Sequence, residues 1–434
     1  MLICGIRSGE SLTSAKEDIV EDNLIANTKE MALDIVGPEA IRDPHRYFGE
    51  LRVMTPVLWD SRSRSWIVTG YQEITAALRN DKDFSSDRIR PFIAKKLSGP
   101  DTDPKVRYAF EVLANWLVFN DKPKHLWLRK LINQAFMSKA MEQLAGKFTA
   151  LFDQVINATP DNGEIDILND VSVPFSASVI SEMLGVPPED RSRFADWHRL
   201  FGPIIGASLD DSNKYKSISE GVEQLSNYVK ELIARYRIRP ENNLLSELIK
   251  ARDNEDTLSE EEIVSTCTLV IFAGSETTAN LIANAMLALL RFPEQMELMR
   301  SGQVEIGNAV EEFLRFDGSG KAVTRLARHD TNVLGAPMLE GQRIFLILAA
   351  ANRDPSIFPD PNQLILNRKF DRSHIAFGYG LHSCMGLQLA RLETSIAIPA
   401  ILRKWRHIEL AGELEWHPQL LARGLKALPV RVQS

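Results

Sequence analysis

The longest helical pattern of the chain constrains its fold more than any other segment. It covers residues 258–292, where Ser259 and Glu262 form a capping box at the start and the letters RFP end the helix. From Tyr71 to about Phe292 the pattern is mostly helical, interrupted by turn-forming clusters such as PDNG and GVPPED. We therefore predict a chain that is mainly α-helical.

A small β portion is predicted on both sides of this helical region. TPVLWD and SWIVTG have the composition of strands joined by the polar turn SRSRS, and RIFLILAAA predicts a later strand. A final helix is expected after Cys384. Residues 1–35 are polar with weak periodicity, so we predict a partly disordered N-terminal segment and a single domain over residues 36–434.

Composition excludes several classes of protein. The net charge is −7, so no overall positive field attracts nucleic acid or an anionic membrane. The three cysteines, Cys4, Cys267 and Cys384, are too few for a disulfide framework and indicate a reducing compartment. The opening residues do not resemble a signal peptide, and no run of about 20 apolar residues predicts a membrane span. We expect a cytoplasmic protein without a membrane span.

The segment AFGYGLHSCMGLQLAR at 376–391 places Cys384 where a glycine-rich loop becomes a helix. Backbone N–H groups at a helix start stabilise a thiolate. A nucleophile would need a base, and nothing local orients His382. Zinc would need further ligands at short spacing, whereas haem iron accepts a single protein thiolate. A buried structural cysteine is the remaining alternative.

The spacing of the glycines around Cys384 decides among these alternatives, because it resembles the haem-binding loop of the cytochrome P450 family. The pattern F-G-x-G-x-H-x-C-x-G is matched by Phe377, Gly378, Gly380, His382, Cys384 and Gly386. The resemblance implies the triangular cytochrome P450 fold, with Cys384 as the axial ligand of a haem b iron and Phe377 covering the sulfur. One departure is Met385, where leucine is more usual.

The string FAGSETTAN within the long helix is similar to the family's A-G-x-E/D-T motif. The matching residues are Ala273, Gly274, Glu276 and Thr277. The resemblance implies that this helix crosses the distal haem face, where Glu276 and Thr277 assist proton delivery to dioxygen. The alternative is a patch of small residues that permits close helix packing. Cys267, in the same helix, we interpret as an ordinary core residue.

Glu312 and Arg315 resemble the family's structural E-x-x-R pair, and Arg368 is predicted to complete their network. Glu297 and Arg300 have the same spacing, but we interpret them as a solvated surface pair because they precede the family's position. Two haem propionates require cations. Residues at matching positions are His125, Arg129, Arg325 and His382.

The substrate is the least constrained part of this reading. By position in the family, Leu269, Phe272, Ala273, Lys321 and Val323 are expected to line the pocket. Lys321 is a candidate partner for a substrate carboxylate, although solvent and a propionate are alternative partners. The loop around 92–118 is expected to supply the rest of the wall.

We therefore predict a monomeric haem-thiolate monooxygenase that uses dioxygen to hydroxylate a small, largely apolar molecule. We expect no attached flavin or iron–sulfur domain, so a separate ferredoxin and its reductase would supply electrons. Basic residues such as Arg129, Lys130 and Lys139 could receive an acidic ferredoxin. The alternatives are a non-catalytic haem sensor or ligand carrier, a peroxygenase, and a cysteine hydrolase without haem.

Overall fold

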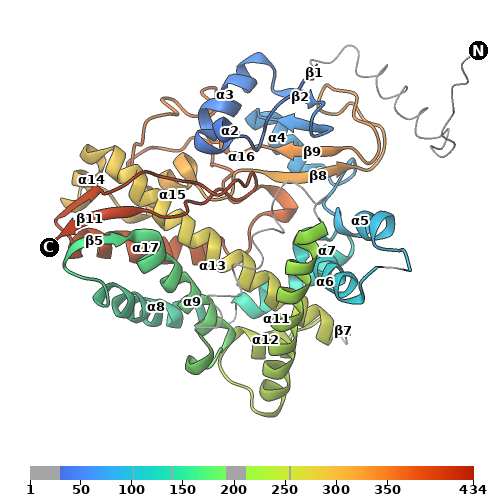
Figure 1. Ribbon diagram of the computed structural model, residues 1–434, viewed down its shortest axis with the longest axis horizontal. Helices are drawn as coiled ribbons and strands as arrows, with labels where there is room; N and C mark the ends of the chain where they lie inside the picture. The colour runs from blue at the N-terminus through green and yellow to red at the C-terminus, as the bar shows by residue number, and fades with distance from the viewer. Residues whose placement is uncertain (1–29, 101, 138–139, 192–211, 254–255) are drawn as a thin grey trace, which may run out of the picture.

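Helix α13 (Glu260–Arg291) runs through the middle of the molecule and organises the other helices around it (Figure 1). The structure is a computed structural model that describes residues 30–100, 102–137, 140–191, 212–253 and 256–434. The predicted capping box is confirmed: Ser259 accepts from the Glu262 N–H, and the Glu262 carboxylate accepts from the Ser259 N–H. Most of α13 is buried, and it contacts α6, α9, α11, α12, α14, α15 and α17.

The remaining helices confirm the predicted mainly α architecture. They are α2 (Pro38–Arg42), α3 (Pro44–Met54), α4 (Tyr71–Arg79), α5 (Ile89–Lys96), α6 (Pro104–Ala114), α7 (Lys124–Met137), α8 (Ala140–Asn157), α9 (Val173–Leu184), α11 (Ser212–Ile238), α12 (Leu244–Lys250), α14 (Pro293–Arg300), α15 (Ile306–Asp317), α16 (Leu348–Ala351) and α17 (Leu387–Lys404). Short 3-10 or π turns add η1 (Leu117–Phe119), η2 (Ile167–Ser172), η3 (Pro188–Asp190) and η4 (Gly380–His382).

The small β portion forms three sheets. A six-stranded mixed sheet has the order β1 (Glu30–Met31), β2 (Val57–Asp60), β3 (Ser65–Val68), β9 (Arg343–Leu346), β8 (Val323–Ala327) and β4 (Phe84–Ser85). A second sheet joins β10 (His407–Leu410), β11 (Pro429–Gln433) and β5 (Asn162–Asp166), and a third pairs β6 (Arg252–Asp253) with β7 (Asp256–Thr257). The six-stranded sheet lies on one side of α13, opposite α8, α11 and α12 (Figure 1).

Two boundaries differ from the sequence predictions, whereas the final helix predicted after Cys384 is confirmed as α17. The strand predicted from RIFLILAAA stops at Leu346, and Leu348–Ala351 is helical, because alanine-rich segments favour helix over strand. The last predicted helix, α17, is followed by β10 and β11. Of the predicted N-terminal segment, residues 1–29 lie outside the described residues, whereas residues 30–35 belong to the domain: β1 pairs with β2, and Leu33 and Ile35 are buried.

Candidate functional site

Cys384 lies in a tightly wound loop between η4 and α17. The Cys384 N–H donates to the Phe377 carbonyl over 2.9 Å, which closes the loop back on itself. Gly378 and Gly380 have φ angles of 69° and 71°, the left-handed region that favours glycine. A Cβ atom on Gly380 would also lie 2.9 Å from the Leu78 carbonyl oxygen. Gly378 and Gly380 are therefore required by the backbone path, whereas Gly386 has an ordinary negative φ of −80°.

The thiol of Cys384 is accessible at the start of α17. Its side chain is exposed to a sphere the size of a water molecule, although protein atoms surround it on most sides. Burial raises the pKa of the thiol, while the Gly386 N–H and the charges of Arg129 and Arg391 lower it. The net effect is a raised pKa, so the thiolate needs a further positive partner, and the exposed sulfur is accessible to one. Cys267, by contrast, is buried, and burial raises its pKa to about 12, as expected for a core residue.

One stripe of α13 is unexpectedly open for a helix at the centre of the molecule. Ala273 is exposed, and Leu269, Glu276 and Thr277 are only partly buried, whereas the rest of this stretch is mostly buried. These positions are three to four residues apart, so they share one helix face. Gly274 faces elsewhere: a Cβ atom there would lie 2.3 Å from Ile180 Cδ1 on α9. The close-packing alternative therefore explains Gly274 but not the open stripe.

Thr277 and Glu276 differ in their hydrogen bonding. The Thr277 hydroxyl donates to the Ala273 carbonyl over 2.5 Å, so its oxygen lone pairs remain free to accept. Glu276 has no hydrogen-bond partner among the described residues, and burial raises the pKa of its carboxyl. A carboxyl with a raised pKa keeps its proton at higher pH than an exposed one.

The four predicted propionate cations converge around the Cys384 loop. The ring centroids of His125 and His382 are 4.0 Å apart, and the Arg129 guanidinium donates to Ser383 over 3.2 Å. Neither ring nitrogen of the buried His125 has a hydrogen-bond partner. Arg325 is buried and, within the described part of the chain, bonds only the carbonyl of Thr324. His125 and Arg325 are therefore available to a ligand, whereas His382 Nε2 lies 3.1 Å from the Ser86 hydroxyl.

The electrostatics of this cluster show a shortage of negative charge. Burial and then the charge of Arg129 lower the pKa of His125 to about 4; burial and then Arg325 lower that of His382 to about 2. Burial also lowers the pKa of Arg325 to about 10, against the opposing effect of Asp121. A group carrying carboxylates would relieve this imbalance. The cluster thus fits the two propionates of a haem.

Arg88 belongs to the same cluster but was not predicted from the sequence. Its guanidinium lies 4.9 Å from the ring centroid of Phe119 and has no hydrogen-bond or ion-pair partner in the described ranges. Burial, followed by repulsion from Arg343 and Arg325, lowers the pKa of Arg88 to about 10. The residue follows the FSSD segment directly, but no spacing rule in the sequence distinguishes it from a surface arginine.

The predicted structural network of Glu312, Arg315 and Arg368 is present and buried. Arg315 binds both oxygens of Glu312 over 2.7 Å, and Arg368 Nε lies 3.0 Å from the same carboxylate. The two guanidinium groups also donate to carbonyls of residues 352–363, which lie in the segment leading to the Cys384 loop. Arg300, by contrast, donates to the Leu402 and Trp405 carbonyls instead of pairing with Glu297.

The structure corrects the predicted role of Lys321. Its ammonium group is buried and paired with Asp317, which also binds His45 over 3.0 Å. A buried ammonium needs a carboxylate, and here the protein supplies it. Lys321 is therefore not available to a substrate carboxylate. Of the other predicted pocket residues, Phe272 stacks on Trp116 at 5.1 Å, while Leu269 and Val323 remain partly exposed.

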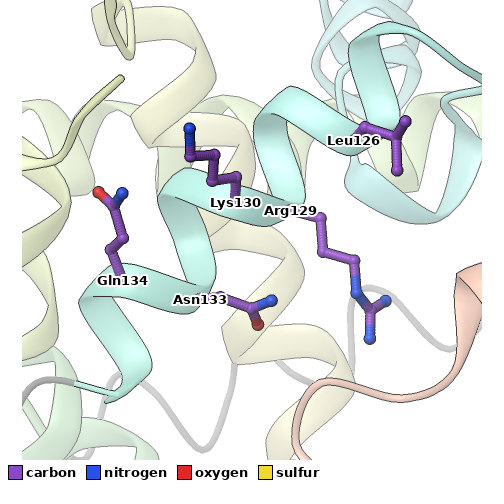
Figure 2. Close-up of a pocket in the computed structure, with 5 residues that line it drawn as sticks. All are labelled: Leu126, Arg129, Lys130, Asn133 and Gln134. Atoms are coloured by element: carbon purple, nitrogen blue, oxygen red, sulfur yellow. The ribbon is translucent and has the colours of Figure 1, made fainter. Parts of the chain in front are cut away.

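A hollow of about 470 Å³ lies along α7, formed by Leu126, Arg129, Lys130, Asn133 and Gln134. Figure 2 shows Arg129 extending from one side of the helix, while Lys130 points away from it. Lys130 is paired with Asp253 over 2.6 Å, and Lys139 lies outside the described residues. Arg129 connects this hollow to the Cys384 loop through its hydrogen bond to Ser383.

Two further findings concern metal-binding groups and membrane spans in the described part of the chain. It contains no group of three or more His, Cys, Asp or Glu side chains arranged to hold a metal ion by themselves. Nor does any described helix combine the length and apolar character needed to span a membrane.

Comparison with known proteins gives consistent results. The Cytochrome P450 family profile matches residues 42–308 and 306–416. The chain is 33% identical to the Biotin biosynthesis cytochrome P450 of Bacillus subtilis (strain 168), covering 92% of this chain and 99% of that protein. It is also 33% identical to Cytochrome P450 monooxygenase PikC of Streptomyces venezuelae, over 92% of this chain and 93% of the relative.

Solved structures agree with these sequence matches. P450BioI, crystallised in complex with hexadec-9Z-enoic acid ligated Acyl Carrier Protein, superposes with a TM-score of 0.82 at 31% identity. The match covers 91% of this chain and 100% of P450BioI. CalO2 superposes with a TM-score of 0.84 at 28% identity, covering 93% and 99% of the two chains.

Proposed function

The chain belongs to the cytochrome P450 family and is a monooxygenase, and on this premise we propose that it hydroxylates a small, largely apolar organic molecule. The reaction would combine the substrate RH with dioxygen, two electrons and two protons to give ROH and water. A separate ferredoxin and its reductase would deliver the electrons, and the cofactor would be haem b.

One observation carries the proposal: the accessible Cys384 thiol lies beside buried basic side chains whose pKa values are lowered and which Asp121 alone does not balance. Cys384 would hold the iron, and His125, Arg129, Arg325, His382 and Arg88 would hold the propionates. The bound haem supplies dioxygen activation, which the electron-donating thiolate favours. Phe377, Gly378 and Gly386 would support the ligand loop, with Phe377 packed against it.

The open stripe of α13 supports a role for Glu276 and Thr277 in proton delivery. The Thr277 oxygen keeps free lone pairs because its proton is committed to the Ala273 carbonyl. The Thr277 oxygen can therefore accept a hydrogen bond from a water molecule, while the Glu276 carboxyl supplies the proton. Ala273, with its small side chain, leaves room beside them. These residues distinguish a monooxygenase from a peroxygenase or from a passive haem carrier.

The electron donor would dock near α7 and the Cys384 loop. Arg129 reaches from the α7 hollow to Ser383, next to the proposed iron ligand (Figure 2). Exposed Arg79 adds positive charge on the loop surface, since its guanidinium lies 4.6 Å from the ring centroid of Tyr379. This charge suits an acidic ferredoxin, although Lys130 is already paired with Asp253.

We further propose that the protein works as a monomer in the cytoplasm. The sparse cysteines support a reducing compartment, and the relatives of bacterial origin are consistent with one.

The reduced, CO-bound absorption spectrum tests the haem site. The wild-type protein should give the red-shifted band that thiolate ligation produces. Cys384→Ser should lose that band, whereas Cys267→Ser should keep it, because Cys267 is buried in the core. A haem-loaded wild-type protein without the band would refute the proposal.

Product formation separates the monooxygenase from the alternative, a haem sensor or ligand carrier. Candidate substrates are first ranked by the low-to-high spin shift that they induce. The panel should include free fatty acids and acyl chains carried on an acyl carrier protein, because P450BioI was crystallised with such a partner. Spin-shifting compounds that never yield product with dioxygen and a surrogate ferredoxin system would favour the sensor.

A further inference from the structure

Three charged or polar side chains meet beside Phe377, the residue that precedes the ligand loop. Glu311 on α15 accepts two bonds from Arg391 on α17, from Nε over 2.6 Å and from Nη2 over 2.9 Å. His374 Nε2 lies 3.1 Å from the same carboxylate. The network of Glu311, Arg391 and His374 thus joins two helices to the segment that enters the Cys384 loop.

The hydrogen bonds of His374 define its tautomer. Its Nδ1 accepts from the Ala376 N–H over 3.3 Å, so Nδ1 carries no proton. Nε2 must then carry the proton and donate to Glu311. The network thus pairs the Arg391 guanidinium with the Glu311 carboxylate, and His374 holds that carboxylate from the side of the ligand loop.

The network lies close to the proposed ligand. The Arg391 guanidinium is 5.1 Å from the centroid of the Phe377 ring, and the Cys384 N–H bonds the Phe377 carbonyl. Arg391 interacts electrostatically with Cys384 in the direction that favours the thiolate. Glu311 opposes this effect, since its carboxylate lies between 2.6 and 2.9 Å from the same guanidinium.

A purely structural role explains little of this arrangement. The side chains of Glu311 and Arg391 are 30% and 31% exposed, and ion pairs with such exposure contribute only about 0–1 kcal/mol to stability. The charge of Arg391 acts electrostatically on Cys384, and Glu311 is bound to the same guanidinium, so the pair can act on the sulfur as well as on stability.

We propose that Glu311 and Arg391 set the reduction potential of the bound haem by balancing charge next to Cys384, with His374 positioning Glu311. This inference deepens the proposed function and rests on its haem site. Reduction adds one electron, so positive charge near the thiolate favours it and negative charge opposes it. The three residues are positioning residues, because none of them contacts the reacting atoms.

Spectroelectrochemical titration of the haem-loaded protein tests the proposal by the sign of each shift. Glu311→Gln removes the balancing anion and should shift the midpoint potential upward. Arg391→Gln removes the cation, leaves Glu311 unbalanced, and should shift the potential downward. The double variant should lie between them, and Arg391→Lys, which keeps the charge, should stay near wild type.

The matched control is Glu409→Gln, which breaks the exposed pair with Arg431 on the distant β10–β11 hairpin. It should leave the potential unchanged. Shifts of the same sign in Glu311→Gln and Arg391→Gln, or no shift in either, would overturn the proposal. The reduced, CO-bound spectrum of each protein is recorded first: a wild type without the thiolate band refutes the haem site itself, whereas intact bands with unmoved potentials refute only the charge balance.

Discussion

Replacing Glu312 by alanine is expected to destabilise the protein strongly, because it leaves two buried guanidinium groups without their anion. The Glu312 and Arg315 side chains are both 0% exposed, and that of Arg368 is 7% exposed. The carboxylate also accepts from the Ile365 N–H over 2.9 Å. Alanine therefore removes an ion pair to each arginine and a backbone hydrogen bond at once.

The magnitude follows from these contacts. Removing one partner of a buried ion pair costs about 3–5 kcal/mol, and here one carboxylate serves two cations. Folded domains are stable by only about 5–15 kcal/mol, so the loss is a large fraction of the total. Glu312→Gln keeps one acceptor oxygen and most of the side-chain volume. Its loss should be smaller but should still exceed about 1 kcal/mol.

Urea unfolding of the purified, haem-loaded proteins, followed by helical ellipticity and tryptophan fluorescence, measures the effect. Glu297→Ala is the matched control, because Glu297 has the same spacing to Arg300 but is exposed and forms no ion pair within the described residues. It should change stability by less than about 0.5 kcal/mol. If Glu312→Ala fails to fold, Glu312→Gln replaces it in the comparison. A Glu312 variant as stable as Glu297→Ala would refute the reasoning.

Three further predictions concern the haem site and the core. Thr277→Ala should lower the ratio of product formed to NADPH consumed about tenfold or more, because proton delivery is impaired. The affinity for substrate, measured by the spin shift, should stay unchanged. An unchanged product-to-NADPH ratio would contradict a role in proton delivery. Arg88→Gln should increase the rate of haem transfer to an excess of acceptor protein about tenfold or more, because a charge-assisted hydrogen bond contributes about 1.5–3 kcal/mol. Arg239→Gln, at an exposed position, should leave that rate unchanged. Glu393 is buried, which raises its pKa from 4.5 to about 8. The folded state therefore binds the proton more tightly than the unfolded state, so this group's contribution to stability falls as pH rises from about 4.5 to 8. Glu393→Gln keeps an acceptor for the Ser176 hydroxyl but cannot ionise. In urea titrations at increasing pH, its free energy of unfolding should rise relative to that of wild type by more than about 1 kcal/mol. A difference that stays constant with pH would contradict the raised pKa of Glu393.

Local sequence patterns correctly predicted helix α13 and the glycine turns around Cys384, because these structures are formed by interactions between neighbouring residues. The capping box at Ser259 and the periodicity that follows it depend on neighbouring residues, so the bounds of α13 agree with the prediction within two residues. The glycines around Cys384 carried a similar local signal, because the left-handed turns at Gly378 and Gly380 exclude most other residues.

Residues whose roles depend on burial and on long-range packing were harder to predict. Lys321 was expected at the pocket wall, but it is buried and bound to Asp317, in a cluster that packing completes with His45, 272 residues before Asp317. Arg88 is separated from Arg325 by more than two hundred residues, so its place among the cations follows from packing alone. RIFLILAAA was extended too far as a strand, because the register with β3 ends at Leu346.

The sequence alone determined the family resemblance, the ligand loop, the central helix and the order of the charged motifs, since each rests on residues close together in the chain. The tertiary structure decided which charges are balanced and which remain free. Pairing satisfies Lys321, whereas Arg88 has no ion-pair partner in the described ranges, and Asp121 is the one carboxylate that acts on both His125 and Arg325 there. Electrostatic energy depends on distance in space and on burial, and neither is encoded by spacing along the chain.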